Sequence, residues 1–275
     1  MIVASELFRG AASYHARHAV PYPDDLFRSL VRLCGLTSSS RALDLGAGTG
    51  QIGIPLARSV ADVLFVDPSD EMVREGRRKA DAQGVKNIKY LVSRSEDLNE
   101  PMASFDIATI AESFFFMDRE TVLAKLAQAL KPGGCVVIIN RERDSSEPGA
   151  WHIPLLRELQ EFWGDSFPEG LRPALTLSDT GVRASLDREA LRASHFSEIT
   201  ELCHYYERRC NIDELLGYLH STSLGAPATL GPRHEEFTTR FRRFLLSYSP
   251  SGVFVERGHV TTLLGHRPSL PFGTP

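Results

Sequence analysis

The chain has 275 residues, of which 42% are hydrophobic and 24% are charged, values that are ordinary for a globular protein with a sizeable core. A net charge of -4 and a pI near 6.2 give no electrostatic reason to bind nucleic acid. No stretch is long enough to span a bilayer, and residues 1–6 lack the pattern of a signal peptide, so we expect a cytoplasmic protein. The four cysteines show no metal-ligand spacing, and we expect no metal site.

The most informative segment is 43–50, Leu-Asp-Leu-Gly-Ala-Gly-Thr-Gly. Residues 41–45 suit a buried strand, and the three alternating glycines allow a sharp turn and a close approach to a ligand. A helix is predicted over 50–59, with Thr49 as its N-cap and Pro55 in its early part. Strand, glycine turn and helix together predict the opening of a Rossmann-like unit.

Two cofactor classes fit this turn. Residues 48–53 match the G-x-G-x-x-G pattern of dinucleotide enzymes. Asp44, however, would place a carboxylate where a pyrophosphate has to lie, which is unfavourable for a dianion and favourable for a cationic amino group. S-adenosylmethionine carries such an ammonium group.

The next strand also ends in an acid. Residues 63–67 form an apolar run that closes on Asp67, whose carboxylate can accept both hydroxyls of a ribose. Ser69 is predicted to cap a helix that has Asp70 and Glu71 in its first turn. NAD and S-adenosylmethionine sites share such an acid, so Asp67 alone does not choose between them.

Further alternation of elements predicts a doubly wound, mostly parallel α/β sheet. A helix that begins near Asp118 should stop at the sequence Lys-Pro-Gly-Gly of 131–134. Additional strands are predicted over 87–92, 105–110, 135–140, 196–206 and 258–264, and helices over 187–193, 213–220 and 234–248. The predicted organisation is an N-terminal helical cap segment (1–35), a cofactor-binding core (36–140), a lid insertion (141–187), a completion of the core with acceptor-site helices (188–267) and a tail (268–275).

Several motifs, in their order along the chain, resemble those of class I S-adenosylmethionine-dependent methyltransferases. They are the segments 43–50, 66–73, 95–98, 105–119 and 130–134. More narrowly, the segments 8–12, 21–23, 113–114 with 117–119, and 217–223 resemble the small-molecule branch that includes trans-aconitate methyltransferase-like proteins. The resemblance implies a seven-stranded Rossmann-like fold with a helical cap and a methyl group transferred to an oxygen or nitrogen atom of a small molecule.

Carried over residue by residue, the resemblance implies where the cofactor lies. Asp44, Gly46 and Gly48 would surround its methionine end, Asp67 would bind the ribose, and Met72 would pack on the adenine. Glu96 and Asp97 would flank the adenine edge, and Ala111 would lie beside the sulfonium. The full predicted set is Asp44, Gly46, Ala47, Gly48, Gly50, Gln51, Asp67, Pro68, Met72, Glu96, Asp97 and Ala111.

The acceptor side departs from the family pattern, because Phe115-Phe116 stands where relatives often carry His-Trp, a candidate base. We expect the acceptor pocket to include Tyr14, Tyr22, Phe115, Phe116 and Trp151. If the acceptor is a hydroxyl, a base must take its proton, and His18, Glu112, His152 and His204 are candidates. His152, next to Trp151 in the predicted lid, is favoured as the catalytic residue.

Other interpretations stay open at this point. Asp44 could simply accept hydrogen bonds from backbone amides, and Asp67 could cap a turn. The aromatic residues could simply pack in the core. An NAD-dependent oxidoreductase and a non-catalytic cofactor-binding protein are the alternatives to a methyltransferase. We expect a monomer or homodimer whose partner is a small-molecule acceptor, with neither nucleic acid nor membrane.

Overall fold

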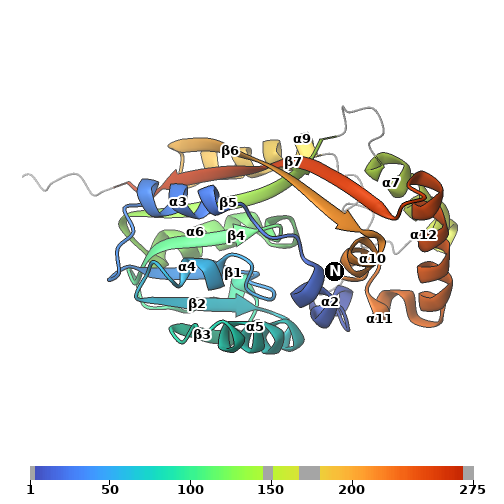
Figure 1. The fold of residues 1–275 in the computed structure, drawn as a ribbon. Coiled ribbons are helices and arrows are strands. Elements are labelled where there is room, and N and C mark those ends of the chain that lie inside the picture. The colour runs from blue at the N-terminus through green and yellow to red at the C-terminus, as the bar shows by residue number, and fades with distance from the viewer. Residues whose placement is uncertain (1–3, 145–150, 167–179, 269–275) are drawn as a thin grey trace, which may run out of the picture. The chain divides into compact units, whose positions relative to one another are not determined.

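The computed structural model describes residues 4–144, 151–166 and 180–268. Its strands form a seven-stranded sheet in the order β3-β2-β1-β4-β5-β7-β6 (Figure 1). The strands are β1 (Arg41–Leu45), β2 (Asp62–Asp67), β3 (Ile88–Val92), β4 (Phe105–Ala111), β5 (Leu130–Arg143), β6 (Ile199–Asn211) and β7 (Val253–His266). Pairing is parallel throughout β3, β2, β1, β4 and β5, which confirms the predicted α/β fold.

The strand order reverses between β1 and β4. The chain winds outward from β1 to β3 on one side and then returns to place β4 on the other side of β1. Ligands of such open sheets bind at the carboxyl ends of the strands that flank this reversal. The carboxyl ends of β1, β2 and β4 therefore define where a cofactor is expected, and these are the ends that carry the predicted site residues.

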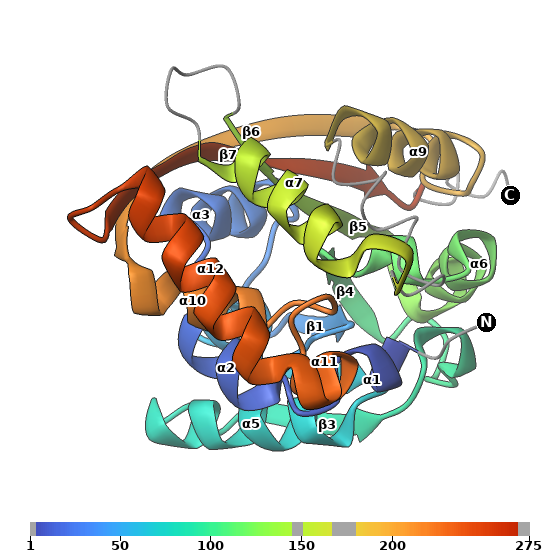
Figure 2. The ribbon, with the colours of Figure 1, turned by 90° about the vertical axis from the view of Figure 1, so that its right-hand side faces the viewer.

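Apolar runs explain why these strands are central. Leu43, Leu45, Phe65 and Val66 are fully buried, as are Ile107, Ala108 and Ile110 of β4 and residues 136–139 of β5. Strands with helices on both faces are expected to be continuously hydrophobic rather than alternating. In Figure 2, α3 (Asp24–Leu33) lies on one side of the strands and α6 (Arg119–Ala129) on the other.

Helix starts follow the capping residues that the sequence indicates. Ser69 accepts a hydrogen bond from the Met72 N–H at 3.3 Å at the start of α5 (Asp70–Ala82), and Asp118 accepts one from the Thr121 N–H at 3.0 Å at the start of α6. The predicted cap Ser69 and the predicted start of a helix near Asp118 are both confirmed. The remaining helices are α1 (Ala4–Leu7), α2 (Ala12–His18), α4 (Gly53–Leu56), α7 (His152–Trp163), α9 (Thr180–Arg192), α10 (Ile212–His220), α11 (Pro227–Leu230) and α12 (His234–Tyr248), with single 3-10 turns at 95–97, 114–116, 164–166 and 231–233.

The predicted helix over 50–59 is wrong in its length and in its cap. Only α4, Gly53–Leu56, is helical, and no side chain caps it; the Thr49 hydroxyl donates to the Gln51 side chain at 3.1 Å. Gly50 has a φ of 82°, outside the helical region, so the turn continues past the predicted helix start. Glycine and proline inside the remaining segment keep the helix short.

Strand boundaries differ from the prediction at β5. The Lys-Pro-Gly-Gly sequence, at which the preceding helix was predicted to stop, belongs to β5, and the register between β4 and β5 shifts between Phe105 and Ile107. Such an irregularity accommodates a proline, which cannot donate to the ladder. The elements β6, β7 and α9 are also longer than predicted because their ends carry charged residues that obscure the periodicity.

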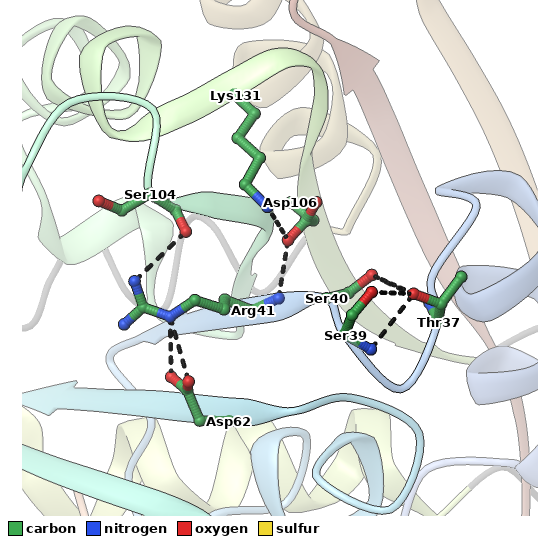
Figure 3. A network of polar contacts seen from close by, with 8 residues as sticks. All are labelled: Thr37, Ser39, Ser40, Arg41, Asp62, Ser104, Asp106 and Lys131. Carbon is green, nitrogen blue, oxygen red and sulfur yellow. Dashed lines mark hydrogen bonds and ion pairs between the residues drawn. The ribbon is translucent and has the colours of Figure 1, made fainter.

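The amino ends of the strands carry a network of ion pairs (Figure 3). Arg41 Nε lies 3.1 Å from Asp62 Oδ2, and Lys131 Nζ lies 2.8 Å from Asp106 Oδ2. The Arg41 N–H also donates to Asp106 at 2.7 Å, so one acid joins β1, β4 and β5. These side chains are partly exposed, and each acid has a cationic partner. The network ties strands together at this edge of the sheet.

The chain divides into two compact units, each described here by itself. Unit 1 comprises 1–20, 142–179 and 205–259, and unit 2 comprises 21–141, 180–204 and 260–275. In unit 1, Phe162 of α7 packs edge-on against Phe237 of α12, with ring centroids 5.1 Å apart. The predicted division into five segments stays a prediction, and parts of its lid (145–150 and 167–179) and tail (269–275) lie outside the described residues. No helix among the described residues is long and apolar enough to cross a membrane.

Candidate functional site

Asp44 lies in β1 with only 2% of its surface exposed. Its Oδ1 accepts from the Thr109 hydroxyl at 2.7 Å, and its Oδ2 accepts from the Gly53 N–H at 3.0 Å. Burial raises the pKa of this carboxyl to about 7, against the opposing effect of the two hydrogen bonds. Asp44 therefore holds the start of α4 against the sheet and gains its charge near neutral pH.

Asp67 ends β2 and is also buried. Its Oδ2 accepts from the Gly48 N–H and its Oδ1 from the Ser69 N–H, both at 2.8 Å. Burial raises the pKa of Asp67 as well. The carboxylate thus joins the glycine turn after β1 to the start of α5, and each oxygen keeps a second acceptor position.

The glycine turn needs its glycines for two reasons. Gly46 has a φ of 62°, and a Cβ there would lie 2.4 Å from the Ser113 hydroxyl. That hydroxyl donates to the Leu45 carbonyl at 3.3 Å, so the segment after β4 packs directly on the turn after β1. A Cβ on Gly53 would lie 2.1 Å from the ring of Phe65 and 2.9 Å from Asp44. At both positions a side chain packs so closely on the backbone that only glycine fits.

Other predicted cofactor residues occupy the same edge of the sheet in unit 2. Met72 is buried on α5, and the Ala47 N–H donates to the Val66 carbonyl at 3.2 Å. Glu96 accepts from the Asp118 N–H at 2.9 Å; although burial opposes it, this bond helps to hold the pKa of Glu96 below its usual range. The placements of the remaining five are simple: Gly48, Gly50 and Gln51 belong to the turn, Pro68 follows β2, and Asp97 is exposed. Ala111 is the last residue of β4.

Three of the predicted acceptor residues, Tyr22, Phe115 and Phe116, lie in unit 2. A guanidinium faces two of their rings: Arg141 Cζ is 4.8 Å from the ring centroid of Tyr22, and Arg183 Cζ is 4.2 Å from that of Phe115. The ring of Phe116 lies 4.0 Å from that of Phe115.

One carboxylate, that of Glu112, accepts hydrogen bonds from the backbone N–H of Arg141 and from the side chain of Arg183. The Arg141 N–H donates to Glu112 Oε1, and Arg183 Nη1 donates to Glu112 Oε2 at 3.3 Å. The sequence interpretation missed both arginines, since nothing local indicates that positions 112, 141 and 183 meet. Glu112, a candidate base, is here a hydrogen-bond acceptor for its neighbours.

The predicted acceptor residues Tyr14 and Trp151 and the predicted base His152 belong to unit 1. Trp151 is buried, and its ring N–H donates to the Val255 carbonyl at 3.1 Å. The ring of Tyr14 lies 5.0 Å from that of His220. These contacts account for packing inside unit 1, and the roles of Tyr14 and Trp151 toward an acceptor stay predictions.

His152 belongs to a charged cluster of unit 1 centred on buried Glu256. Glu256 accepts from Arg143 at 3.2 Å, Tyr206 at 2.9 Å and Arg208 at 2.7 Å. Although burial opposes ionisation, the two arginines lower the pKa of Glu256 to about 2. Burial and the charge of Arg143 lower the pKa of His152. Its Nε2 is buried without a hydrogen-bond partner in the part of the chain that the structure describes.

The other two candidate bases have structural partners. In unit 1, the ring of His18 lies where a Cβ on Gly217 would be, which fixes α2 against α10. In unit 2, His204 Nδ1 lies 3.1 Å from Asp25 Oδ2. Among the described residues, no group of three or more His, Cys, Asp or Glu side chains is placed to hold a metal ion.

Comparisons with known proteins agree with this geometry. Residues 42–134 match the model of a methyltransferase domain. The chain is 31% identical over 125 residues to the ubiquinone/menaquinone biosynthesis C-methyltransferase UbiE of a Marinomonas species, a match that covers 44% of this chain and 50% of that protein. The chain thus spans about half the length of the curated relatives it matches.

Two solved structures share the fold. A putative type II methyltransferase from Anaeromyxobacter dehalogenans has a TM-score of 0.61 at 21% identity, covering 90% of this chain and 97% of its own. The [4+2]-cyclase SpnF has a TM-score of 0.51 at 20% identity, covering 89% of this chain and 81% of its own. The methyltransferase domain matched over residues 42–134, the sheet order and the two buried acids of β1 and β2 support a class I S-adenosylmethionine-dependent methyltransferase. The narrower resemblance to trans-aconitate methyltransferase-like proteins stays a prediction.

Proposed function

We propose that this protein transfers a methyl group from S-adenosylmethionine to a small-molecule acceptor. One observation carries the proposal: two buried carboxylates stand at the carboxyl ends of β1 and β2 beside a glycine turn. Neither Asp44 nor Asp67 has a cationic side chain among the groups that shift its pKa in the described residues. Buried acids without a counter-charge are costly, and a ligand that carries an ammonium group and a ribose supplies the missing partners.

The residues of unit 2 fit such a ligand. Asp67 accepts from two backbone amides and keeps two acceptor positions for ribose hydroxyls. Asp44, at the end of β1, provides negative charge beside the glycine turn, and buried Met72 provides apolar surface for a base ring. The side chain of Ser113 packs against Gly46 and holds the glycine turn in its shape. When bound, S-adenosylmethionine supplies an electrophilic methyl group, and the protein's task is to align an acceptor and exclude water.

For the acceptor, we infer an oxygen or nitrogen nucleophile. His152 is proposed as the base for a hydroxyl acceptor, because burial and Arg143 lower its pKa and keep the imidazole neutral at pH 7. A neutral imidazole nitrogen can accept a proton directly. A neutral amine acceptor would need no base. Substitution of His152 would then change at most the affinity for the acceptor.

Two alternatives receive less support. A dinucleotide would need the Gly48 N–H for its pyrophosphate, whereas this N–H donates to Asp67 at 2.8 Å. The cyclase with the same fold is the observation in favour of another chemistry on this scaffold, since a fold by itself does not specify a reaction. A monomer or homodimer in the cytoplasm remains our expectation.

The test is transfer of a labelled methyl group from S-adenosylmethionine to a panel of small acceptors. We expect acceptor-dependent label transfer with equal formation of S-adenosylhomocysteine. In Asp67→Asn the rate at limiting cofactor should fall, while Asp62→Asn on the same strand serves as the matched control. Binding of S-adenosylhomocysteine without transfer to any acceptor would favour the non-catalytic alternative, and no binding at all would overturn the proposal.

A further inference from the structure

Arg183, near the start of α9, has one part of its guanidinium engaged and another part without a hydrogen-bond partner in the described part of the chain. Nη1 donates to Glu112 Oε2 at 3.3 Å, and the guanidinium carbon lies 4.2 Å from the ring centroid of Phe115. Nε is buried and has no hydrogen-bond partner among the described residues. The side chain as a whole is only 13% exposed. A charged donor is therefore held in a fixed position with an unused N–H group.

One turn further along α9, Asp187 fixes this helix to the rest of unit 2. Asp187 is fully buried, and it accepts from Arg119 Nε at 3.0 Å and from Asn140 Nδ2 at 2.9 Å. Asn140 belongs to β5 and directly precedes Arg141. The hydrogen bonds of Asp187 thus hold the start of α9 beside the carboxyl end of β5. The position of Arg183 therefore does not depend on its own ion pair alone.

Glu112, which holds Arg183, has an unusual backbone. Its φ is 54°, a left-handed conformation that residues with a Cβ rarely adopt. Three hydrogen bonds fix it: its N–H donates to the Ile139 carbonyl at 3.0 Å, and its carboxylate accepts from Arg141 and Arg183. Strained residues of this kind cluster at functional sites.

The position of Glu112 relates Arg183 to the cofactor turn. Glu112 follows Ala111 at the end of β4, and Ser113 follows Glu112. Ser113 bonds the Leu45 carbonyl and lies against Gly46, as described above. Arg183 therefore pairs with Glu112, which directly precedes the residue that packs on the glycine turn. All of these residues belong to unit 2.

The chemistry of the unused edge indicates a ligand. A guanidinium presents Nε and Nη2 as one edge with two parallel N–H groups, and Glu112 engages the other terminal nitrogen, Nη1. That edge matches the two oxygens of a carboxylate or of a phosphate ester. The other oxygen of Glu112 accepts from the Arg141 backbone N–H, so this carboxylate engages the Arg183 guanidinium at Nη1.

We propose that Arg183 is a specificity-determining residue that binds an oxyanion group, a carboxylate or a phosphate ester, on the methyl acceptor. The proposal rests on the proposed function, because it assigns the acceptor's chemistry to the same site. Glu112 is the positioning residue for Arg183, and Phe115 supports the plane of the guanidinium. The acceptor is then an acid, and its neutral derivatives are poor ligands.

The test is calorimetry on the protein saturated with S-adenosylhomocysteine, with benzoate, phenyl phosphate and benzamide as probes. At least one anion should bind about tenfold or more tightly than benzamide, as expected for a charged hydrogen-bonded pair. The two anions distinguish a carboxylate from a phosphate site. Arg183→Gln should abolish the preference for the anion, and Arg183→Lys should restore part of it. Arg188→Gln, on the same helix but paired with Glu201 at the surface, should keep the full preference.

The ratio of anion to amide affinity separates specificity from structure, because a purely structural loss would weaken all three probes together. Equal binding of anions and benzamide, binding of none of the probes, or an unchanged ratio in Arg183→Gln would overturn the inference. Binding of S-adenosylhomocysteine is measured in the same preparation. If it binds and the anion preference is missing, only the inference fails; if it does not bind, the proposed function fails.

Discussion

The acidic side chains at the two edges of the same sheet differ in their exposure and in their bonding partners. At the amino edge, Asp62 pairs with Arg41 and Asp106 pairs with Lys131, and these side chains are partly exposed (Figure 3). At the carboxyl edge, Asp44 and Asp67 are buried and accept hydrogen bonds from backbone amides and one hydroxyl. Asp62 and Asp67 even begin and end the same strand.

The difference separates stability from function. An acid with a cationic partner at the surface is satisfied within the protein and contributes modestly to stability. A buried acid whose only partners are neutral donors keeps an unfavourable charge, and its pKa rises in consequence, as it does for Asp44 and Asp67. We interpret the carboxyl edge as prepared for a ligand that carries the missing positive charge.

The largest expected effect is on cofactor affinity at Asp67. Asp67→Asn should weaken binding of S-adenosylhomocysteine at least about 100-fold, because two charge-assisted hydrogen bonds to the ribose are lost. Asp62→Asn, five residues earlier in β2, should leave the affinity within about twofold. Isothermal calorimetry with both variants measures the contrast. Equal losses in the two variants would remove the distinction between the edges.

A second prediction concerns pH. Because the pKa of Asp44 is about 7 without ligand, the carboxyl is increasingly protonated below that pH and attracts an ammonium group less. Affinity for S-adenosylhomocysteine should therefore fall about tenfold from about pH 7.5 to about pH 5.5. Asp44→Asn cannot titrate, so its affinity should be lower and nearly constant over this range. A slope that persists in the variant would assign the titration to another group.

The third prediction compares two glycines with similar backbones. Gly46 and Gly84 have φ of 62° and 70°, but a Cβ on Gly46 would meet Ser113, whereas a Cβ on Gly84 would have nothing within 4 Å. Gly46→Ala should lower the free energy of unfolding by about 2 kcal/mol or more and weaken cofactor binding. Gly84→Ala should lower it by about 1 kcal/mol and leave cofactor binding unchanged. Urea unfolding and calorimetry provide both readouts.

The smallest effect is expected at the amino edge. Lys131→Met removes the partner of Asp106 and should lower the free energy of unfolding by less than about 1 kcal/mol at moderate salt, because the pair is partly exposed and screened. Methyl transfer and cofactor affinity should not change. Unfolding in urea at low and high salt measures this, and a loss of cofactor affinity would show that the two edges are not independent.

The sequence was sufficient for the parts of the fold that local patterns specify. The strands around Leu43 and Phe65, the cap Ser69 and the start of a helix near Asp118 were predicted because apolar runs and helix-start signals act over a few residues. The helix after Thr49 was overestimated, because the left-handed Gly50 and the packing of Gly53 against Phe65 depend on the sheet beneath.

Long-range pairing was not predictable in the same way. Thr109, 65 residues from Asp44, supplies one of its hydrogen bonds, and Arg183 lies 71 residues from Glu112. The left-handed backbone of Glu112 has no local signature, because glycine, not glutamate, normally indicates such a conformation. The acids of the candidate site could thus be proposed from the sequence, but their burial and their hydrogen-bond partners, and the contact between Arg183 and Glu112, required the fold.

The most direct test of the central claim, that the carboxyl edge holds a cationic nucleoside cofactor, is one set of calorimetric titrations. S-adenosylhomocysteine, NAD and 5′-methylthioadenosine, which lacks the amino-acid portion, are titrated onto the wild-type protein. We predict tight binding of S-adenosylhomocysteine, binding of 5′-methylthioadenosine weaker by about tenfold or more, and none of NAD. Binding of NAD in preference to S-adenosylhomocysteine, or equal affinity with and without the ammonium group, would contradict the account.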